Sequence, residues 1–205
     1  WILILLFVFW GCNQKETNDV TVNNVLNDSL PVYFLLANDF NLPIQKRLDY
    51  INKANEIVNS QENDFLNRVN LFKIANRYYN INSFKEYFKT VNLVLENSET
   101  VADSNSIAKA YGYLGDYYRM KSVSDSSFLF YNKAEKLYVK LNNNKIQLVK
   151  ILINKANLLF RVGDFIGSEK EVFKVLRLIR SDNSKEFKEV YYDAYNTLGL
   201  VYNGM

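Results

Sequence analysis

Apolar and polar residues follow one another along most of the chain with a period close to 3.6 residues, which is the period of an α-helix. Tyr111, Leu114 and Tyr118, for example, recur at intervals of three and four residues and therefore share one face of a helix. Short segments with Gly, Asn or Ser separate such stretches. The pattern predicts helices over residues 31–39, 44–59, 63–80, 84–97, 104–120, 125–141, 145–162, 165–180 and 185–203.

The chain also repeats itself, with a period of about 41 residues. Residues 111–118 have the pattern Tyr-x2-Leu-Gly-x2-Tyr, and residues 195–202 have the same pattern again. A small residue on a helix allows a neighbouring helix to approach closely, so the repeat predicts a series of closely packed helix pairs. The small residues of four successive repeats, at offsets of 40, 41 and 43 residues, are Ala75, Gly115, Ala156 and Gly199.

These motifs resemble the tetratricopeptide repeat (TPR), in which a helix A with aromatic-x2-Leu-Gly-x2-Tyr precedes a helix B with small-x3-aromatic-x2-Ala. Residues 127–134 follow the helix B pattern as Ser-x3-Tyr-x2-Ala. The resemblance implies an all-α, right-handed superhelical solenoid of stacked antiparallel helix pairs, with repeats of about 40 residues where the family has about 34. A generic helical bundle with an aromatic core is the alternative, but it does not account for the repeated motif.

The turns between helices A and B carry their own signals. Residues 163–165, Gly-Asp-Phe, resemble the turn of the family. Asn82 takes the place of that glycine in an earlier repeat, and Asn tolerates the left-handed conformation that a helix C-terminus needs. Ser83 and Glu86 have the spacing of a capping box, so we expect the next helix to begin there.

The first twelve residues resemble the end of a bacterial lipoprotein signal. Residues 1–10 carry no charge and would span only about 15 Å as a helix, half the thickness of a bilayer core. Gly11-Cys12 matches the point at which such signals are cleaved and the Cys is lipidated, whereas Phe9 and Trp10 depart from the pattern. An ordinary cleaved signal, or a membrane anchor whose first half precedes the given sequence, therefore remains an alternative. All three predict an extracytoplasmic location in the bacterial cell envelope.

The sequence divides into three parts by composition. Residues 1–12 form the signal-like segment, which we expect to lack its true N-terminus, and residues 13–29 are polar and predict a tether. Residues 30–205 hold about 4.5 repeats, and the last helix has the pattern of helix A. A finishing repeat normally has a polar outer face, so we expect the array to be incomplete at its C-terminus.

Composition excludes several classes of function. The 205 residues contain no His and one Cys, which excludes imidazole catalysis, His-ligated zinc and a disulfide framework. A net charge of +3, with both signs interspersed, does not provide the basic face of a nucleic-acid binder. The Ser-rich segment 122–127 lacks the base that a nucleophile needs. We therefore predict a protein that is not an enzyme and has no cofactor or metal.

The resemblance also implies a binding surface on the concave face of the solenoid, formed by helices A. Asn offers both a donor and an acceptor to the backbone of an extended peptide, and an excess of basic residues favours an acidic peptide or a C-terminal carboxylate. Asn as an ordinary solvated residue is the alternative interpretation. The expected groove residues are Phe72, Asn76, Tyr79, Asn80, Lys109, Arg119, Lys150, Asn157, Phe160, Arg161 and Asn196.

Together these features predict a non-catalytic module that binds a protein or an extended peptide, tethered to a membrane through an N-terminal lipid at Cys12 or an anchor. The resemblance implies that it is the sensing half of a bacterial signalling protein. The alternative is a self-contained structural lipoprotein that scaffolds an envelope complex.

Overall fold

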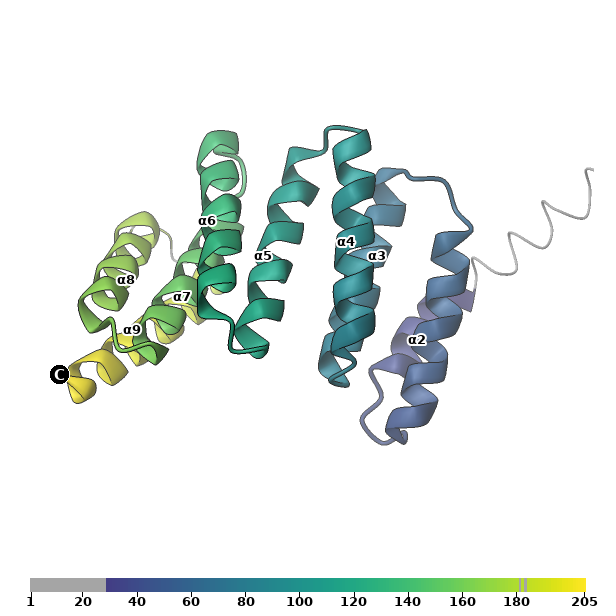
Figure 1. The fold of residues 1–205 in the computed structure, drawn as a ribbon, viewed down its shortest axis with the longest axis horizontal. Helices are drawn as coiled ribbons and strands as arrows, with labels where there is room; N and C mark the ends of the chain where they lie inside the picture. Colours follow the sequence, from purple (N-terminus) through teal and green to yellow (C-terminus); the bar gives the residue numbers. More distant parts are fainter. Residues whose placement is uncertain (1–28, 181, 183) are drawn as a thin grey trace, which may run out of the picture. The chain divides into compact units, whose positions relative to one another are not determined.

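The computed structural model describes residues 29–180, 182 and 184–205, which form helices joined by short turns, without a strand (Figure 1). Residues 29–37 form a first helix. The predicted helices are confirmed, and no boundary differs from its prediction by more than three residues. The later helices are α2 (Ile44–Asn59), α3 (Phe65–Asn80), α4 (Phe84–Thr100), α5 (Ser104–Met120), α6 (Ser124–Leu141), α7 (Lys145–Arg161), α8 (Phe165–Ile179) and α9 (Lys185–Gly204).

The chain falls into two compact units, which meet between Ser60 and Gln61. In the first unit, the helix of residues 29–37 and α2 bury one apolar stripe each. Arg47 fixes the connection between them, because its Nε donates to the carbonyl oxygen of Ala37 at 3.0 Å and its guanidinium lies 4.6 Å from the ring centroid of Phe40. The described part of the first unit, residues 29–60, is therefore one helix hairpin.

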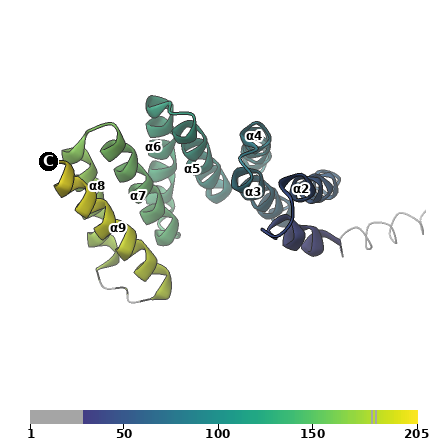
Figure 2. The same cartoon turned by 90° about the horizontal axis from the view of Figure 1, so that it is seen from below.

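The second unit contains α3 to α9, which follow one another in sequence order (Figure 2). Each helix packs against the next, and α9 packs against both α7 and α8. One apolar cluster joins α7, α8 and α9, and a second joins α5, α6 and α7. Because α7 contributes to both clusters, the core continues from one helix pair to the next. This arrangement confirms the prediction of an all-α helical repeat solenoid.

Small residues set the spacing within the pairs. A Cβ atom on Gly115 of α5 would lie 2.4 Å from Cδ1 of Tyr131 of α6, so only glycine fits there. Ser127 Oγ donates to the carbonyl oxygen of Gly115 at 2.9 Å. Ser168 Oγ makes the same bond to the carbonyl oxygen of Ala156, at 2.8 Å, in the pair α7–α8. The predicted close approach is thus confirmed in both pairs.

Gly199 of α9 occupies the same place in the motif but not the same environment. A Cβ atom on Gly199 would meet no atom within 4 Å. No helix of the described chain covers this glycine, so a glycine at this place of the motif does not by itself bring a neighbour close.

The turns follow the predicted geometry, with one exception. Asn82 and Gly163 have φ angles of 60° and 84°, which confirms the left-handed conformation at both places. The amide of Ser83 then donates to the carbonyl oxygen of Tyr78 at 2.9 Å, which closes the end of α3. The predicted capping box is wrong, because the Ser83 hydroxyl bonds the Glu86 carboxylate at 2.7 Å and makes no side-chain cap. This bond lowers the pKa of Glu86.

A buried lysine joins three helices. Lys155 of α7 stands where α5 has Leu114, and its side chain is 4% exposed. Its Nζ pairs with the carboxylates of Glu135 on α6 and, at 3.5 Å, of Glu171 on α8. Lys174 contacts the same two carboxylates at 3.8 and 2.9 Å. The two carboxylates therefore neutralise the positive charge of Lys155, which would otherwise be costly to bury at a core position.

Candidate functional site

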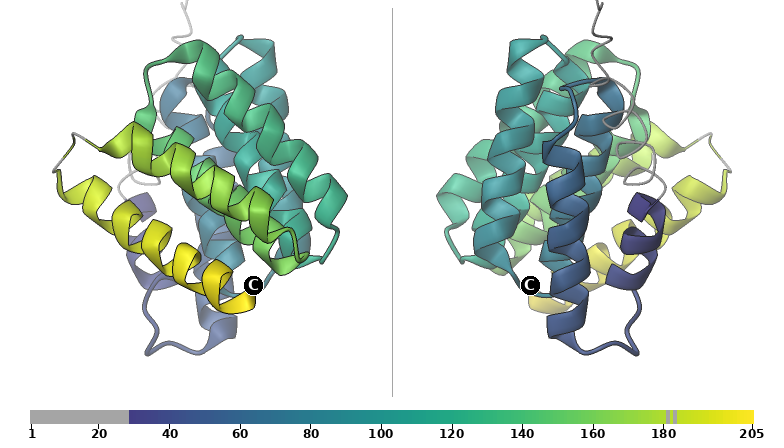
Figure 3. Two further views of the ribbon diagram at one scale, coloured as in Figure 1. Left: turned by 90° about the vertical axis from the view of Figure 1, so that its left-hand side faces the viewer. Right: turned by 90° about the vertical axis from the view of Figure 1, so that its right-hand side faces the viewer.

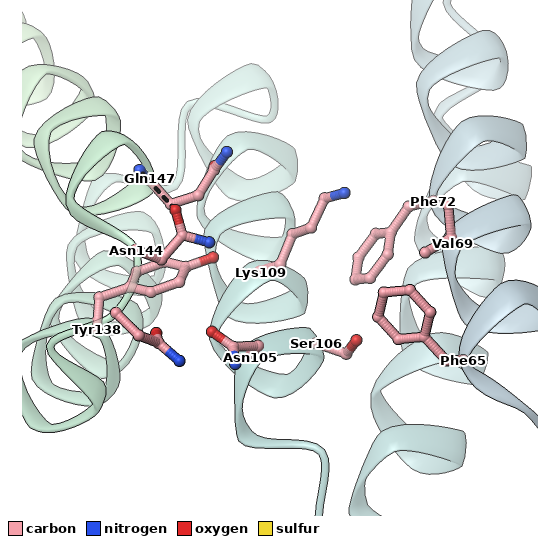
Figure 4. Close-up of a pocket in the computed structure, with 10 residues that line it drawn as sticks. Phe65, Val69, Phe72, Asn105, Ser106, Lys109, Tyr138, Asn144 and Gln147 are labelled. Atoms are coloured by element: carbon pink, nitrogen blue, oxygen red, sulfur yellow. Dashed lines mark hydrogen bonds between the residues drawn. The ribbon is translucent and has the colours of Figure 1, made fainter.

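A cavity of about 380 Å³ opens on the second unit between α3, α5 and the start of α7 (Figure 4). Aromatic side chains come from α3, and amide side chains come from the far side, where α6 ends and α7 begins. Lys109 of α5 lies between these two walls. The lining residues are Phe65, Val69, Phe72, Asn105, Ser106, Lys109, Tyr138, Asn143, Asn144 and Gln147.

Lys109 is the charged residue of the lining. Its Nζ lies 4.3 Å from the ring centroid of Phe72 and 5.8 Å from that of Tyr113. Burial lowers the pKa of Lys109, and the positive charges of Lys150 and Lys73 lower it further. No carboxylate is among the side chains that line this cavity of the described chain. An anion bound here would relieve the repulsion between the three lysines.

The amide wall is partly ordered by the start of α7. Asn144 is the N-cap of this helix, and its Oδ1 accepts from the amide of Gln147 at 3.4 Å (Figure 4). Asn105, at the start of α5, is exposed at the same cavity. Amide side chains donate and accept at once, so this wall is suited to the backbone of an extended peptide.

The aromatic wall offers an apolar contact. Phe72 is buried beneath Lys109, whereas Phe65 is 68% exposed at the first position of α3. The start of α3 is fixed, because the Asp64 carboxylate accepts from the amide of Asn67. The exposed ring of Phe65, on a helix start whose backbone is held in place, can bury an apolar side chain of a ligand.

Two of the eleven expected groove residues, Phe72 and Lys109, line this cavity, and so does Val69, a further position that the repeat pattern of helix A indicates. Lys150 lies close enough to act on the pKa of Lys109, and Asn76 bonds the side chain of Tyr113. Burial raises the pKa of Tyr113 to about 12, against the effect of that bond.

Other predicted groove residues make contacts within the protein. Thr197 Oγ1 donates to Oδ1 of Asn157 at 2.9 Å, which joins α9 to α7. The ring of Phe160 packs on that of Phe165, with centroids 5.6 Å apart. Three further residues are exposed outside the cavity: Asn80, Arg161 and Asn196.

Arg119 and Tyr79 lie in the last turns of α5 and α3, outside the cavity lining, and belong to a polar network. Asp116 Oδ1 accepts from the Tyr131 hydroxyl at 2.6 Å and from Asn154 Nδ2 at 3.3 Å. The Arg119 guanidinium donates to the hydroxyls of Tyr131 and Tyr79, both at 3.3 Å, and lies 3.6 Å from Asp116. Burial raises the pKa of Asp116, while the bond from Tyr131 and the charge of Arg119 oppose this. The guanidinium of Arg119 is therefore already used in contacts between α3, α5 and α6.

Sequence reasoning missed most of the cavity lining. The resemblance placed most of the groove between the middle and the C-terminal end of each helix A, whereas the cavity lies nearer to their first turns. The run of three Asn at residues 142–144 was the available signal, because it ends at the start of α7. The missed residues are Phe65, Asn105, Ser106, Tyr138, Asn143, Asn144 and Gln147.

Other predictions concern parts that the structure does not reach. The lipidation of Cys12, the signal-like segment 1–12 and nearly all of the tether 13–29 lie outside the described residues, although Ser29 is already helical. Among the helices that are described, none has the length and apolarity needed to cross a membrane. The described residues also contain no group of His, Cys, Asp and Glu that could hold a metal ion.

Solved structures with a similar fold are known. The sequence matches no protein-family model and no curated protein. A Podosopora anserina protein described as a kinesin light chain with nearly identical TPR-like repeats has a TM-score of 0.60 at 9% identity, over 89% of this chain and 95% of that one. The fold is TPR-like. BtubC (BKLC) from P. vanneervenii has a TM-score of 0.65 at 12% identity, over 92% of this chain and 85% of that one. The apo form of RapI also has a TM-score of 0.65, at 13% identity, over 90% of this chain and 71% of that one.

Proposed function

We propose that this TPR-like chain is a non-catalytic module that binds an extended peptide across α3, α5 and α7. The supporting observation is the cavity around Lys109, which combines a half-buried cation with an aromatic wall and an amide wall. TPR-like neighbours support a protein-interaction module, because repeats of this kind present long surfaces to partners.

The proposed ligand carries a carboxylate next to an apolar side chain. The carboxylate, from an acidic residue or a C-terminus, pairs with Lys109, and the apolar side chain packs on Phe65. The backbone between them meets Asn105, Asn144 and Gln147. The proposal thus keeps the acidic or C-terminal peptide expected from the sequence but moves its position towards the first turns of the helices.

An array of short random peptides, made once with free carboxylates and once with amidated C-termini, tests this function. We expect the parent protein to select peptides that have a carboxylate near an aromatic or aliphatic residue. Lys109→Met should lower the affinity for the selected peptides by about tenfold or more, since a hydrogen bond to a charged group contributes about 1.5–3 kcal/mol. Lys121→Met is the matched control, because Lys121 also lies on aromatic rings, 5.6 Å from the centroid of Phe84, but outside the cavity. Selection without an acidic preference, or unchanged binding by Lys109→Met, contradicts the proposal.

We propose also that the module is exported and held at the bacterial envelope, as the sensing half of a signalling protein. The support comes from the uncharged segment 1–10 and the Gly11-Cys12 pair that follows it. A lipid contributes about 0.8 kcal/mol per buried methylene, so Cys12→Ser should move the chain from the membrane fraction to the soluble fraction. Mass spectrometry of the N-terminal peptide of the parent checks the lipid directly, and an unmodified Cys12 would exclude it.

A further inference from the structure

The exposed charges of α6 and α8 are almost all positive. On α6 three lysines are exposed and Asp125 is the one exposed acid among its described residues. Among the described residues of α8 no acid is exposed. The net charge of +3 for the whole chain therefore hides a local excess of positive charge. The exposed basic residues are Lys133, Lys136 and Lys140 of α6, Lys170 and Arg177 of α8, and Arg180, the C-cap of α8.

Large apolar side chains are exposed on the same two helices. Val139 of α6 is 59% exposed and Ile166 of α8 is 76% exposed, and Leu129 and Phe173 are exposed as well. Spacings of three and four residues place side chains on one side of a helix. The outer side of α6 thus carries Leu129, Lys133, Lys136 and Lys140, and that of α8 carries Ile166, Lys170, Phe173 and Arg177. Apolar and basic side chains are therefore mixed on both helices.

A hollow of about 280 Å³ joins the two outer sides. Val139 lines it from α6, Arg177 and Leu178 line it from α8, and Leu148 and Leu152 line it from α7. The opposite side of α8 packs against α7 and α9 (Figure 3). The exposed basic and apolar residues of α6 and α8 therefore belong to one surface, which we call the basic face.

Helix α4 is also a helix B, but its outer side is different. Its exposed charged residues are Lys85, Lys89, Glu96 and Glu99, so the two signs balance. No large apolar residue among the described residues of α4 is strongly exposed. This is the ordinary composition of a helix surface in water. The basic face has a composition that exposure to water alone does not require.

The basic face lies within the array and not at its end. In a repeat protein each helix pair contacts only its neighbours. A further repeat after α9 would lie beside α8 as α8 lies beside α6, and would leave the outer sides of both helices open. A second copy of the chain is disfavoured as well, because two basic faces repel each other.

We propose that the basic face binds the surface of a membrane that contains anionic lipids. The basic side chains contact the headgroups, and the apolar ones enter the boundary between headgroups and acyl chains. A helix of an acidic partner would fill the hollow, but Leu129, Ile166 and Phe173 lie outside the lining of the hollow and would stay in water. A flat lipid surface contacts both helices at once. This contact is separate from the cavity around Lys109 and does not depend on a lipid at Cys12.

A fluorophore on the basic face tests the contact directly. The sequence has one cysteine, Cys12, so the full chain with Cys12→Ser and Val139→Cys can be labelled with NBD at a single site. We expect the NBD emission to rise with vesicles of phosphatidylglycerol and phosphatidylcholine, to rise much less with phosphatidylcholine alone, and to fall again at high salt. The same label at Glu96→Cys, on the outer side of α4, is the matched control and should not respond.

Two triple variants of the labelled chain separate the basic face from the total charge. Lys136→Gln/Arg177→Gln/Arg180→Gln removes three charges from the face and should lower the affinity for the mixed vesicles by about tenfold or more. The control removes the same charge elsewhere, at exposed positions, and should lower the affinity by about threefold or less. Thermal melting should be unchanged in both, because all the replaced side chains are exposed. The control is Lys46→Gln/Lys85→Gln/Lys89→Gln.

The cavity is tested for independence in the same assay. Lys109→Met in the labelled chain should bind the mixed vesicles almost as the labelled parent does, since Lys109 is not part of the basic face. Loss of peptide selection by this variant with normal vesicle binding would keep the two surfaces apart.

Several results would overturn the proposal. They are no response of the label at Val139→Cys to the mixed vesicles, an equal response to phosphatidylcholine alone, an equal response of the label at Glu96→Cys, and an equal loss of affinity in the two triple variants. An equal response to a double-stranded oligonucleotide or to polyglutamate, at the same concentration of negative charge, would assign the face to a nucleic acid or to an acidic protein instead.

Discussion

Gly115 and Gly199 occupy the same place in two copies of one motif, but their environments are opposite. The Cβ position of Gly115 lies 2.4 Å from the ring of Tyr131, and the ring belongs to a side chain that is fully buried. The Cβ position of Gly199 has no neighbour within 4 Å. In a helix interior, alanine is favoured over glycine by about 1 kcal/mol. The balance between helix propensity and packing therefore has a different sign at the two places.

Gly115→Ala and Gly199→Ala should change the free energy of unfolding in opposite directions. At Gly115 the added methyl group forces Tyr131 or the helix to move, which costs about 1–3 kcal/mol and exceeds the gain in propensity. Gly115→Leu should be destabilising as well. At Gly199 only the gain remains, up to about 1 kcal/mol. Urea unfolding of the two variants checks both signs, and a Gly115→Ala variant as stable as the parent would contradict the packing of this pair.

At the scale of elements, one carboxylate both begins a helix and ties it to another. Asp103 is the N-cap of α5, and its Oδ1 accepts from the amide of Ser106 at 3.1 Å. Its Oδ2 accepts from Nε of Arg68, on α3, also at 3.1 Å. Burial would raise the pKa of Asp103, but the bonds from Ser106 and Arg68 outweigh it and lower the pKa. The ionised form is therefore the one that holds α5 against α3.

The contribution of Asp103 to stability should depend on pH with a definite sign. A carboxyl whose pKa is lower in the folded state stabilises above its unfolded pKa, and this contribution is lost as the pH falls through the folded value. Asp103→Ala should cost about 1–3 kcal/mol at neutral pH, from the lost cap and the unpaired arginine. The difference from the parent should shrink towards about pH 2. Asp193→Ala, at an exposed position, is the control. A difference that stays constant between the two pH values would contradict the ion pair.

Helix α9 should be less protected than the helices that are packed on both sides. Its stripe around Tyr195 and Gly199 is open, whereas the corresponding face of α5 is covered by α6. A helix with fewer buried apolar contacts opens at a lower free energy. Amide hydrogen exchange should be faster in α9 than in α5 and α6. Exchange in α9 as slow as in residues 104–141 would contradict this.

At the scale of the whole molecule, helix pairs are joined by a core that runs through α7. The apolar clusters on its two sides are connected by the charged cluster of Lys155, Glu135, Glu171 and Lys174, which spans α6, α7 and α8. In a repeat protein each pair contacts only its neighbours, so stability depends on such interfaces.

Lys155→Ala should destabilise the protein strongly. Its removal leaves Glu171, whose side chain is 10% exposed, and Glu135 without the cation that neutralises them, and breaking a buried pair costs about 3–5 kcal/mol. Lys136→Ala, an exposed lysine of the same region, should stay within about 0.5 kcal/mol of the parent. The midpoints of thermal unfolding compare the two variants, and equal midpoints would show that the cluster has no structural role.

The sequence by itself determined the helices, their repeat and their turns. A helix face is set by residues three and four positions apart, and the end of a helix is set by one residue such as Asn82 or Gly163. These interactions are local, so they can be recognised along the chain. The same reasoning found Phe72 and Lys109, because both lie on the side of helix A that the repeat pattern identifies.

Tertiary structure decided what the side chains do. Whether Arg119 is free for a ligand depends on Asp116, Tyr131 and Tyr79, which come from three different helices. The cavity brings side chains from the start of α7 together with side chains of α3 and α5, which lie more than thirty residues away in the sequence. The environment of a side chain is fixed by residues that are distant in the chain. For this reason the glycine of the motif is tightly packed in one copy, at position 115, and open in another, at position 199.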